Sequence, residues 1–106
     1  MVMSSVAGKD PDHKLGVYGM TKATLNTMVY ALSKELRADG VRVNGIAPGL
    51  IRTTLSEPLF GAVQPEPSMV GEIEDIGATA ALMCSPVDGS FINGEIFTVH
   101  GGYPKL

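Results

Sequence analysis

Short apolar runs typical of buried β-strands alternate along this chain with longer segments of helical periodicity, and this order constrains the fold most. Strand-like runs occupy the N-terminus, residues 41–47 and residues 96–102, and helical spacing occurs between them, over 18–38 and 72–85. Parallel strands need such crossovers, because each connection must return along the sheet. The sequence therefore predicts an α/β domain with three parallel strands and two main helices.

The first helical segment, from Tyr18 to Ala38, has clear signals at its end. Lys34 and Arg37 would lie in the last turn, where cations favour the helix dipole, and Gly40 is a natural stop. Apolar residues recur at spacings of three to five, which predicts one buried stripe. The stripe comprises Met20, Ala23, Met28, Ala31, Leu32 and Leu36.

The predicted sheet is thin for an independent domain. Three parallel strands leave apolar edges that natural domains cover, and the sequence has no element before its first strand. We therefore expect the chain to be the latter half of a larger doubly wound domain.

Composition excludes several classes of function. The net charge of −3 and interleaved charges argue against nucleic acid or an anionic membrane as partner. The sequence contains neither an apolar run of membrane-spanning length nor a signal peptide, so we expect no membrane association and no secretion. The lone cysteine, Cys84, is expected to be buried. Neither His13 nor His100 has a metal-ligand partner at useful spacing, so no metal is expected.

Three polar residues can converge at one edge of the predicted sheet. Ser5 ends the first strand, thirteen residues before Tyr18, and Lys22 lies one helical turn after that tyrosine. The Lys22 ammonium can approach the Tyr18 phenol and stabilise its anion, which would make Tyr18 a general acid or base. Ser5 could then hold and polarise the same substrate carbonyl. Tyrosine and lysine at this spacing, taken alone, are better explained as a solvated helix face.

The order, spacing and residues of the motifs resemble those of the short-chain dehydrogenase/reductase family. Ser5 and "YGMTK" are followed by "RVNGIAPGLIRT" and by "GATAALMCSPVDGSFINGEIFTVHGG". The resemblance covers residues 1–106 and is strongest to the peroxisomal NADPH-dependent carbonyl/retinal reductase branch. It implies the C-terminal half of a doubly wound parallel Rossmann-type sheet, without the N-terminal nucleotide-binding half. No Gly-x-x-x-Gly-x-Gly phosphate turn occurs in the sequence.

The resemblance also implies roles for individual residues. Tyr18 would exchange the proton with substrate, Lys22 would stabilise the phenolate and bind the nicotinamide ribose, and Ser5 would position the substrate oxygen. The cofactor is expected to be NADP(H), with NAD(H) as the alternative, and Gly49 would also line the substrate position. The residues expected to bind cofactor are Tyr18, Lys22, Pro48, Gly49, Ile51 and Thr53. Residues 50–71 are expected to be an irregular substrate loop.

The implied function is NAD(P)-dependent interconversion of small carbonyl compounds and alcohols, in a chain that is expected to be truncated and inactive alone. The alternative is a non-enzymatic remnant that associates with full-length subunits. The family resemblance further implies a homo-oligomer. The terminal Pro104, Lys105 and Leu106 resemble a peroxisomal address that an import receptor reads, so peroxisome and cytoplasm both stay open.

Overall fold

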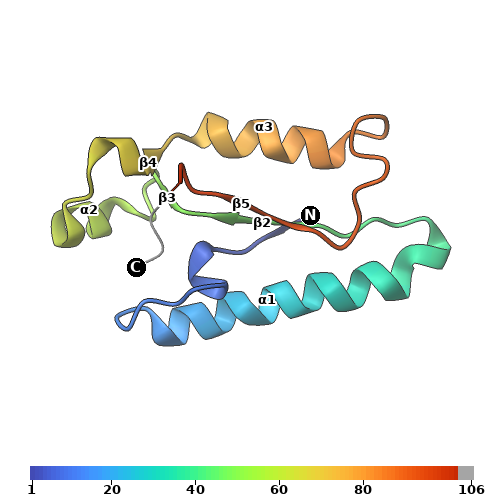
Figure 1. Cartoon of the computed structure of the whole chain (residues 1–106), viewed down its shortest axis with the longest axis horizontal. Helices are drawn as coiled ribbons and strands as arrows, with labels where there is room; N and C mark the ends of the chain where they lie inside the picture. Colours follow the sequence, from blue (N-terminus) through green and yellow to red (C-terminus); the bar gives the residue numbers. More distant parts are fainter. Residues whose placement is uncertain (103–106) are drawn as a thin grey trace.

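The computed structural model describes residues 1–102, and the chain folds into three layers (Figure 1). A parallel sheet lies between α1 (Gly16–Glu35) on one face and α3 (Ile73–Cys84) on the other. The strand order is β1-β2-β5, and both pairings are parallel. These strands are β1 (Val2–Met3), β2 (Gly45–Pro48) and β5 (Ile96–Val99). The predicted α/β architecture, a fragment of a Rossmann-like fold, is confirmed.

The central strand β2 carries the core. Ile46 and Ala47 have no exposed surface, because β2 is covered by a helix on each face and paired on both edges. Gly45 lets α1 come close, since a Cβ there would lie 3.4 Å from the Val29 side chain. A buried cluster of Val29, Val43, Ala47 and Ile96 joins α1 to the sheet, with Val2, Leu32 and Leu36 packed against it. Burial of this apolar surface is the main stabilising contribution.

The helix α1 begins two residues earlier than the sequence predicts and ends three residues earlier. Its last turn tightens into the 3-10 helix η2 (Leu36–Asp39). Gly40 follows with a φ of 72°, and its N–H bonds back to the carbonyls of Leu36 and Arg37. That left-handed conformation suits glycine, so the stop signal in the sequence was interpreted correctly.

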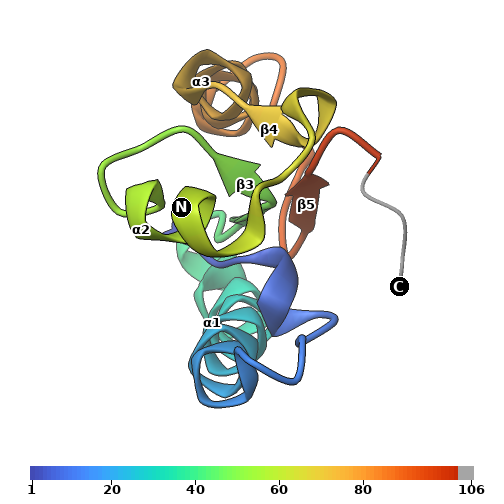
Figure 2. The same cartoon turned by 90° about the vertical axis from the view of Figure 1, so that its left-hand side faces the viewer.

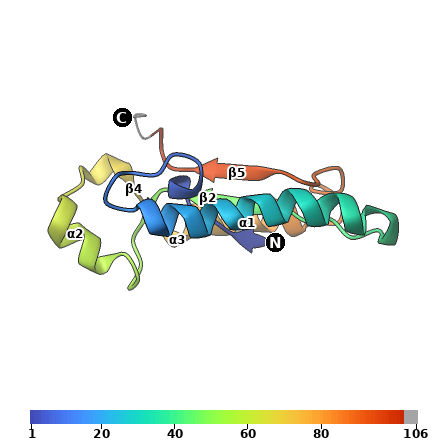
Figure 3. The ribbon, with the colours of Figure 1, turned by 90° about the horizontal axis from the view of Figure 1, so that it is seen from below.

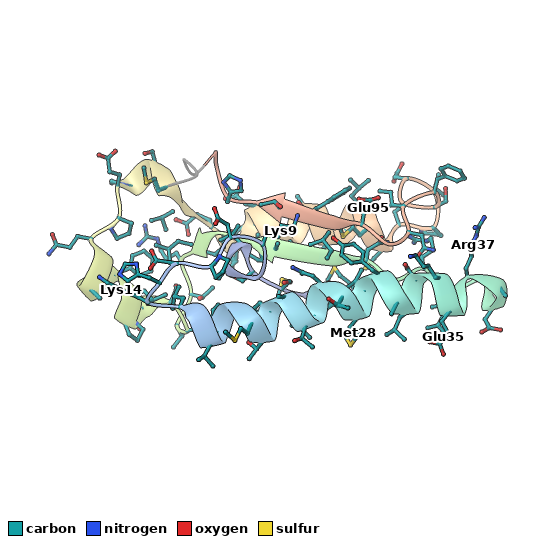
Figure 4. The ribbon with its side chains drawn as sticks, turned by 60° about the horizontal axis from the view of Figure 1, so that its bottom comes forward. Lys9, Lys14, Met28, Glu35, Arg37 and Glu95 are labelled. Atoms are coloured by element: carbon teal, nitrogen blue, oxygen red, sulfur yellow. The ribbon has the colours of Figure 1, made fainter. Side chains whose placement is uncertain are left out.

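The predicted buried stripe on α1 is wrong at both of its methionines and at Ala31, which is also exposed. Met20 is 69% exposed and Met28 is 38% exposed, and Figure 4 shows Met28 on the side of α1 away from the sheet. The residues that α1 buries are instead Gly19, Asn26, Val29 and Ser33. The physical reason is the close approach of the chain after β1: a Cβ on Gly19 would lie 2.6 Å from the Ala7 carbonyl oxygen. Such a close contact leaves no room for a side chain at position 19.

The second strand begins at Gly45, not at Val41 as predicted. Before Gly45, side chains take over part of the backbone pairing: the Asn93 side chain accepts from the Val43 N–H at 2.8 Å, and Asn44 donates to the Ile92 carbonyl at 2.7 Å. Periodicity alone does not reveal this substitution of side-chain for backbone partners.

The segment 50–71, predicted to be irregular, contains regular elements. Its two short strands pair in parallel as a separate small sheet, and Figure 2 shows them with α2 at one end of the molecule. The elements are β3 (Leu50–Ile51), α2 (Glu57–Val63), the 3-10 helix η3 (Pro67–Met69) and β4 (Val70–Gly71). Proline early in α2 and in η3 suits a helix start, so the prolines mark boundaries, not disorder.

The helix α3 forms where the acidic residues and apolar spacing predict it. Glu72 and Asp75 make a reciprocal capping box at its N-terminus. At its other end Met83 is buried and Cys84 is exposed, which contradicts the expected burial of the cysteine. Met83 takes the inward position next to Cys84. The apolar run therefore predicts the helix correctly but not which of its residues is buried.

Within residues 1–102, no helix is long and apolar enough to cross a membrane.

Candidate active site

The carboxyl ends of the three strands lie at one edge of the sheet, and Ser4 and Ser5 follow β1 there. The Ser4 N–H donates to the Ile46 carbonyl at 2.7 Å, which holds the start of this segment beside β2. On the other side, the Gly49 N–H donates to the Val99 carbonyl at 2.8 Å. Open α/β sheets bind ligands outside this edge.

The turn after β1 packs directly on α1. Figure 3 shows the 3-10 helix η1 (Val6–Gly8) beside the first turns of α1. A Cβ on Gly8 would lie 2.7 Å from the Lys22 backbone carbon, so only glycine fits this contact. The buried Ser4 hydroxyl donates to the Lys22 carbonyl at 3.1 Å. The backbone of Ser5 is thereby fixed relative to the helix that carries Tyr18 and Lys22.

Tyr18 and Lys22 share one face of α1. The Lys22 ammonium lies 5.5 Å from the centre of the Tyr18 ring and also donates to the Met3 carbonyl at 3.3 Å. The cation therefore stands between the tyrosine and the end of β1. Tyr18 is 41% exposed, so a substrate can reach its ring from solvent.

Ser5 is half-buried and caps η1. Its hydroxyl oxygen accepts from the Ala7 N–H at 3.2 Å. The hydroxyl proton is left for a further acceptor, such as a carbonyl oxygen. Ser5 can therefore both stabilise its own turn and donate to a ligand.

Pro48 and Gly49 lie at the end of β2, and Ile51 and Thr53 lie just beyond. A Cβ on Gly49 would be 2.7 Å from the His100 Cβ, so this glycine permits the close approach of the chain after β5. The buried Ser56 hydroxyl bonds the Ile51 carbonyl and the Thr53 hydroxyl, and the Thr53 N–H donates to it at 3.1 Å. Ser56 thus holds the group expected to bind nicotinamide in one local turn.

The predicted site residues form two groups in this structure. Ser5, Tyr18 and Lys22 are joined through the contact of η1 with α1, whereas Ile51 and Thr53 belong to the β3 turn. No hydrogen bond or ion pair among residues 1–102 joins the two groups directly. Beside the second group lies a pocket of about 350 Å³. It is lined by Ile51, Ser68, Met69, Val70, Gly71, Asp75, Val99, His100 and Gly101.

Sequence reasoning missed the residues that hold the site together. Ser4 and Gly8 position Ser5 against α1, and Ser56 orders the turn that includes Thr53. The available signal was weak: a second serine beside Ser5 and a glycine three residues on. In the described part of the chain, no three His, Cys, Asp or Glu side chains are grouped so that they could hold a metal ion.

Comparison with known proteins decides the family. A family model described as enoyl-(acyl carrier protein) reductase matches residues 1–104. The chain belongs to the short-chain dehydrogenase/reductase family. Among curated relatives, the human dehydrogenase/reductase SDR family member 4 is 35% identical over an alignment of 113 positions that covers 99% of this chain and 40% of that protein. The chain therefore spans about two fifths of the length of this relative.

Solved structures of this family superpose on the chain. A short-chain type dehydrogenase/reductase from Mycobacterium ulcerans has a TM-score of 0.83 at 34% identity, covering 95% of this chain and 40% of that one. A 4-hydroxyisoleucine dehydrogenase complexed with NADH has a TM-score of 0.86 at 27% identity, covering 96% of this chain and 45% of that one. The three-stranded sheet and its helices therefore occur within longer proteins of the family.

Proposed function

We propose that this chain carries the proton-handling part of an NAD(P)-dependent oxidoreductase that interconverts carbonyl compounds and alcohols. The observation that carries the proposal is the Lys22 ammonium, 5.5 Å from the Tyr18 ring, on a helix that packs against the Ser5 turn. A phenol beside a cation can give a proton to a carbonyl oxygen and take it back from an alcohol.

Each of the three residues has one role in this proposal. Tyr18 donates the proton to the substrate oxygen in reduction and removes it in oxidation. Ser5 donates a hydrogen bond to the same oxygen and orients it. Lys22 places its ammonium beside the Tyr18 ring and, from its position at the end of β1, binds the ribose of the cofactor.

The residues present fit the nicotinamide end of a cofactor. Gly49 lies at the edge of the sheet, and the Ile51 carbonyl and the Thr53 hydroxyl, which both bond the Ser56 hydroxyl, each keep a lone pair that can accept from an amide N–H. A bound nicotinamide supplies or accepts the hydride. We propose Pro48, Gly49, Ile51 and Thr53 as its binding residues, together with Tyr18 and Lys22. The family resemblance favours NADPH. Because one similar structure is described as a complex with NADH, NADH is the alternative cofactor.

The finer proposals concern substrate, location and partners. We propose a small ketone, aldehyde, quinone or retinoid as substrate, as in the carbonyl/retinal reductase branch, with Gly49 next to it. We propose a homo-oligomer, with the exposed Val17 and Met20 of α1 as candidates for subunit contact. The localisation proposal is peroxisome or cytoplasm. The address and import-receptor prediction falls on Pro104, Lys105 and Leu106, which lie outside the described residues.

A second candidate function is association with longer subunits of the family, without catalysis. Two features favour it: the exposed apolar side chains of α1 and the absence of a glycine-rich phosphate turn from the sequence. Hydride transfer needs a cofactor held firmly in place, so we expect these 106 residues by themselves to show no turnover.

Titration of the purified chain with NADPH and NADH, followed by nicotinamide fluorescence during an assay with a simple diketone, separates the two functions. Binding with turnover that Tyr18→Phe abolishes and Tyr30→Phe preserves would support the enzyme, because Tyr30 is an exposed tyrosine elsewhere on α1. No cofactor binding, together with copurification of longer family subunits, would support the association module. Turnover unchanged by Tyr18→Phe would contradict the proposed role of this residue.

A further inference from the structure

The Lys9 side chain reaches across the sheet to its last strand. Its ammonium donates to the Ile96 carbonyl at 2.9 Å and to the Thr98 hydroxyl at 2.7 Å. Figure 4 shows Lys9 between the turn after β1 and β5. A lysine in the loop that follows one edge strand thus bonds the opposite edge strand.

These bonds lie on the outer edge of β5. The carbonyls of Glu95 and Val99 accept from the Gly45 and Gly49 amides, so every second residue of the strand faces β2. By alternation, the backbone N–H and C=O groups of Ile96 and Thr98 point away from β2. No strand within residues 1–102 pairs with this edge, since β5 is last in the order β1-β2-β5.

The backbone of Lys9 is held in place by contacts that do not involve its side chain. Its N–H donates to the Val6 carbonyl at 2.9 Å, and the Asn26 side chain donates to the neighbouring Gly8 carbonyl at 3.1 Å. Gly8 itself lies against the Lys22 backbone. Because α1 anchors this turn, only the side-chain torsions of Lys9 must be ordered to keep the ammonium on β5.

We propose that Lys9 closes the outer edge of β5 to strand pairing between copies of this chain. The outward backbone groups of Ile96 and Thr98 are self-complementary, because an antiparallel copy of the same strand offers matching donors and acceptors about a twofold axis. The ammonium donates to the outward Ile96 carbonyl and places a cation, which has no ion-pair partner within residues 1–102, where a second β5 would approach. A lysine ammonium at a sheet edge is a common protection against edge-to-edge pairing.

The test is the self-association of purified Lys9→Met, which keeps the apolar stem and removes the donor and the charge. Loss of a charge-assisted hydrogen bond predicts roughly tenfold tighter self-association in sedimentation velocity. The matched control is Lys14→Met, because the Lys14 side chain makes no hydrogen bond or ion pair within the described chain. Adding Thr98→Pro to Lys9→Met should restore the parent behaviour, since proline removes an outward N–H and leaves the β2 ladder intact.

Two results would overturn the proposal: Lys9→Met that associates no more tightly than Lys14→Met, or tighter association that Thr98→Pro does not reverse. Amide hydrogen exchange of the unmodified chain tests the same idea if Lys9→Met does not fold. The amides of Ile96 and Thr98 should exchange fast at every concentration, while those of Phe97 and Val99 are protected. Protection of Ile96 and Thr98 that grows with concentration would mean that the edge already pairs and that Lys9 does not close it.

Discussion

The Ser4 hydroxyl donates a 3.1 Å hydrogen bond to the Lys22 carbonyl, and this bond joins the end of β1 to the helix that carries the candidate acid/base pair. Ser4 is buried, whereas its neighbour Ser5 is half-buried with a hydroxyl proton to spare. The two adjacent serines therefore have different roles. Ser4 holds the end of β1 against α1, and Ser5 is available to a ligand.

Replacement of Ser4 by alanine should lower stability more than replacement of Ser5. Ser4→Ala leaves the Lys22 carbonyl without its buried donor, which costs about 1–2 kcal/mol of unfolding free energy. Ser5→Ala removes a cap on the short η1 turn and is expected to cost about 1 kcal/mol or less. Urea unfolding followed by circular dichroism measures both. A larger loss for Ser5→Ala would contradict the division of roles.

Gly19→Ala should destabilise the chain although alanine favours helices. A Cβ at this position would lie 2.6 Å from the Ala7 carbonyl oxygen and 2.7 Å from the Pro11 Cβ. The forced displacement should cost about 1–3 kcal/mol, which exceeds the helix-propensity gain of about 1 kcal/mol. The control is Gly77→Ala on α3, where a Cβ meets nothing within 4 Å, and it should stabilise the chain by roughly 0.5–1 kcal/mol. Opposite signs in urea unfolding are the expected result.

Arg42→Met should loosen the C-terminal end of α3. The guanidinium donates to the carbonyls of Met83 and Ile92 at 2.9 and 3.1 Å, and to that of Ser85 at 3.3 Å. Removing a charged donor from three part-buried carbonyls should cost about 2 kcal/mol or more. Arg37→Met is the control, because the Arg37 side chain makes no hydrogen bond or ion pair among the described residues.

Hydrogen exchange localises the effect of Arg42→Met. The last amides of α3, near Met83 and Cys84, should exchange faster, while the amides in the middle of α1 keep their protection. A uniform rise in exchange over the whole chain would indicate global destabilisation and would contradict a local role in capping α3.

The sequence predicted the layered α/β fold because alternating strand and helix patterns are local signals. The stop at Gly40 and the acidic start of α3 are also local, and both lie where the sequence predicts. The buried face of α1 was wrong, because the choice between Met20 and Gly19 depends on how closely another segment approaches. The beginning of β2 was wrong for a related reason: the Asn93 side chain replaces a ladder bond from fifty positions away.

The sequence alone determined the order of the elements and the positions of Ser5, Tyr18 and Lys22 relative to them, since spacing and periodicity act along the chain. Only the tertiary structure decided what holds these residues in place. The hydrogen bonds of Ser4 to Lys22, of Asn26 to Gly8 and of Lys9 to Ile96 join residues 18 or more positions apart. Such contacts depend on which surfaces meet when the sheet forms, and no local pattern encodes that meeting.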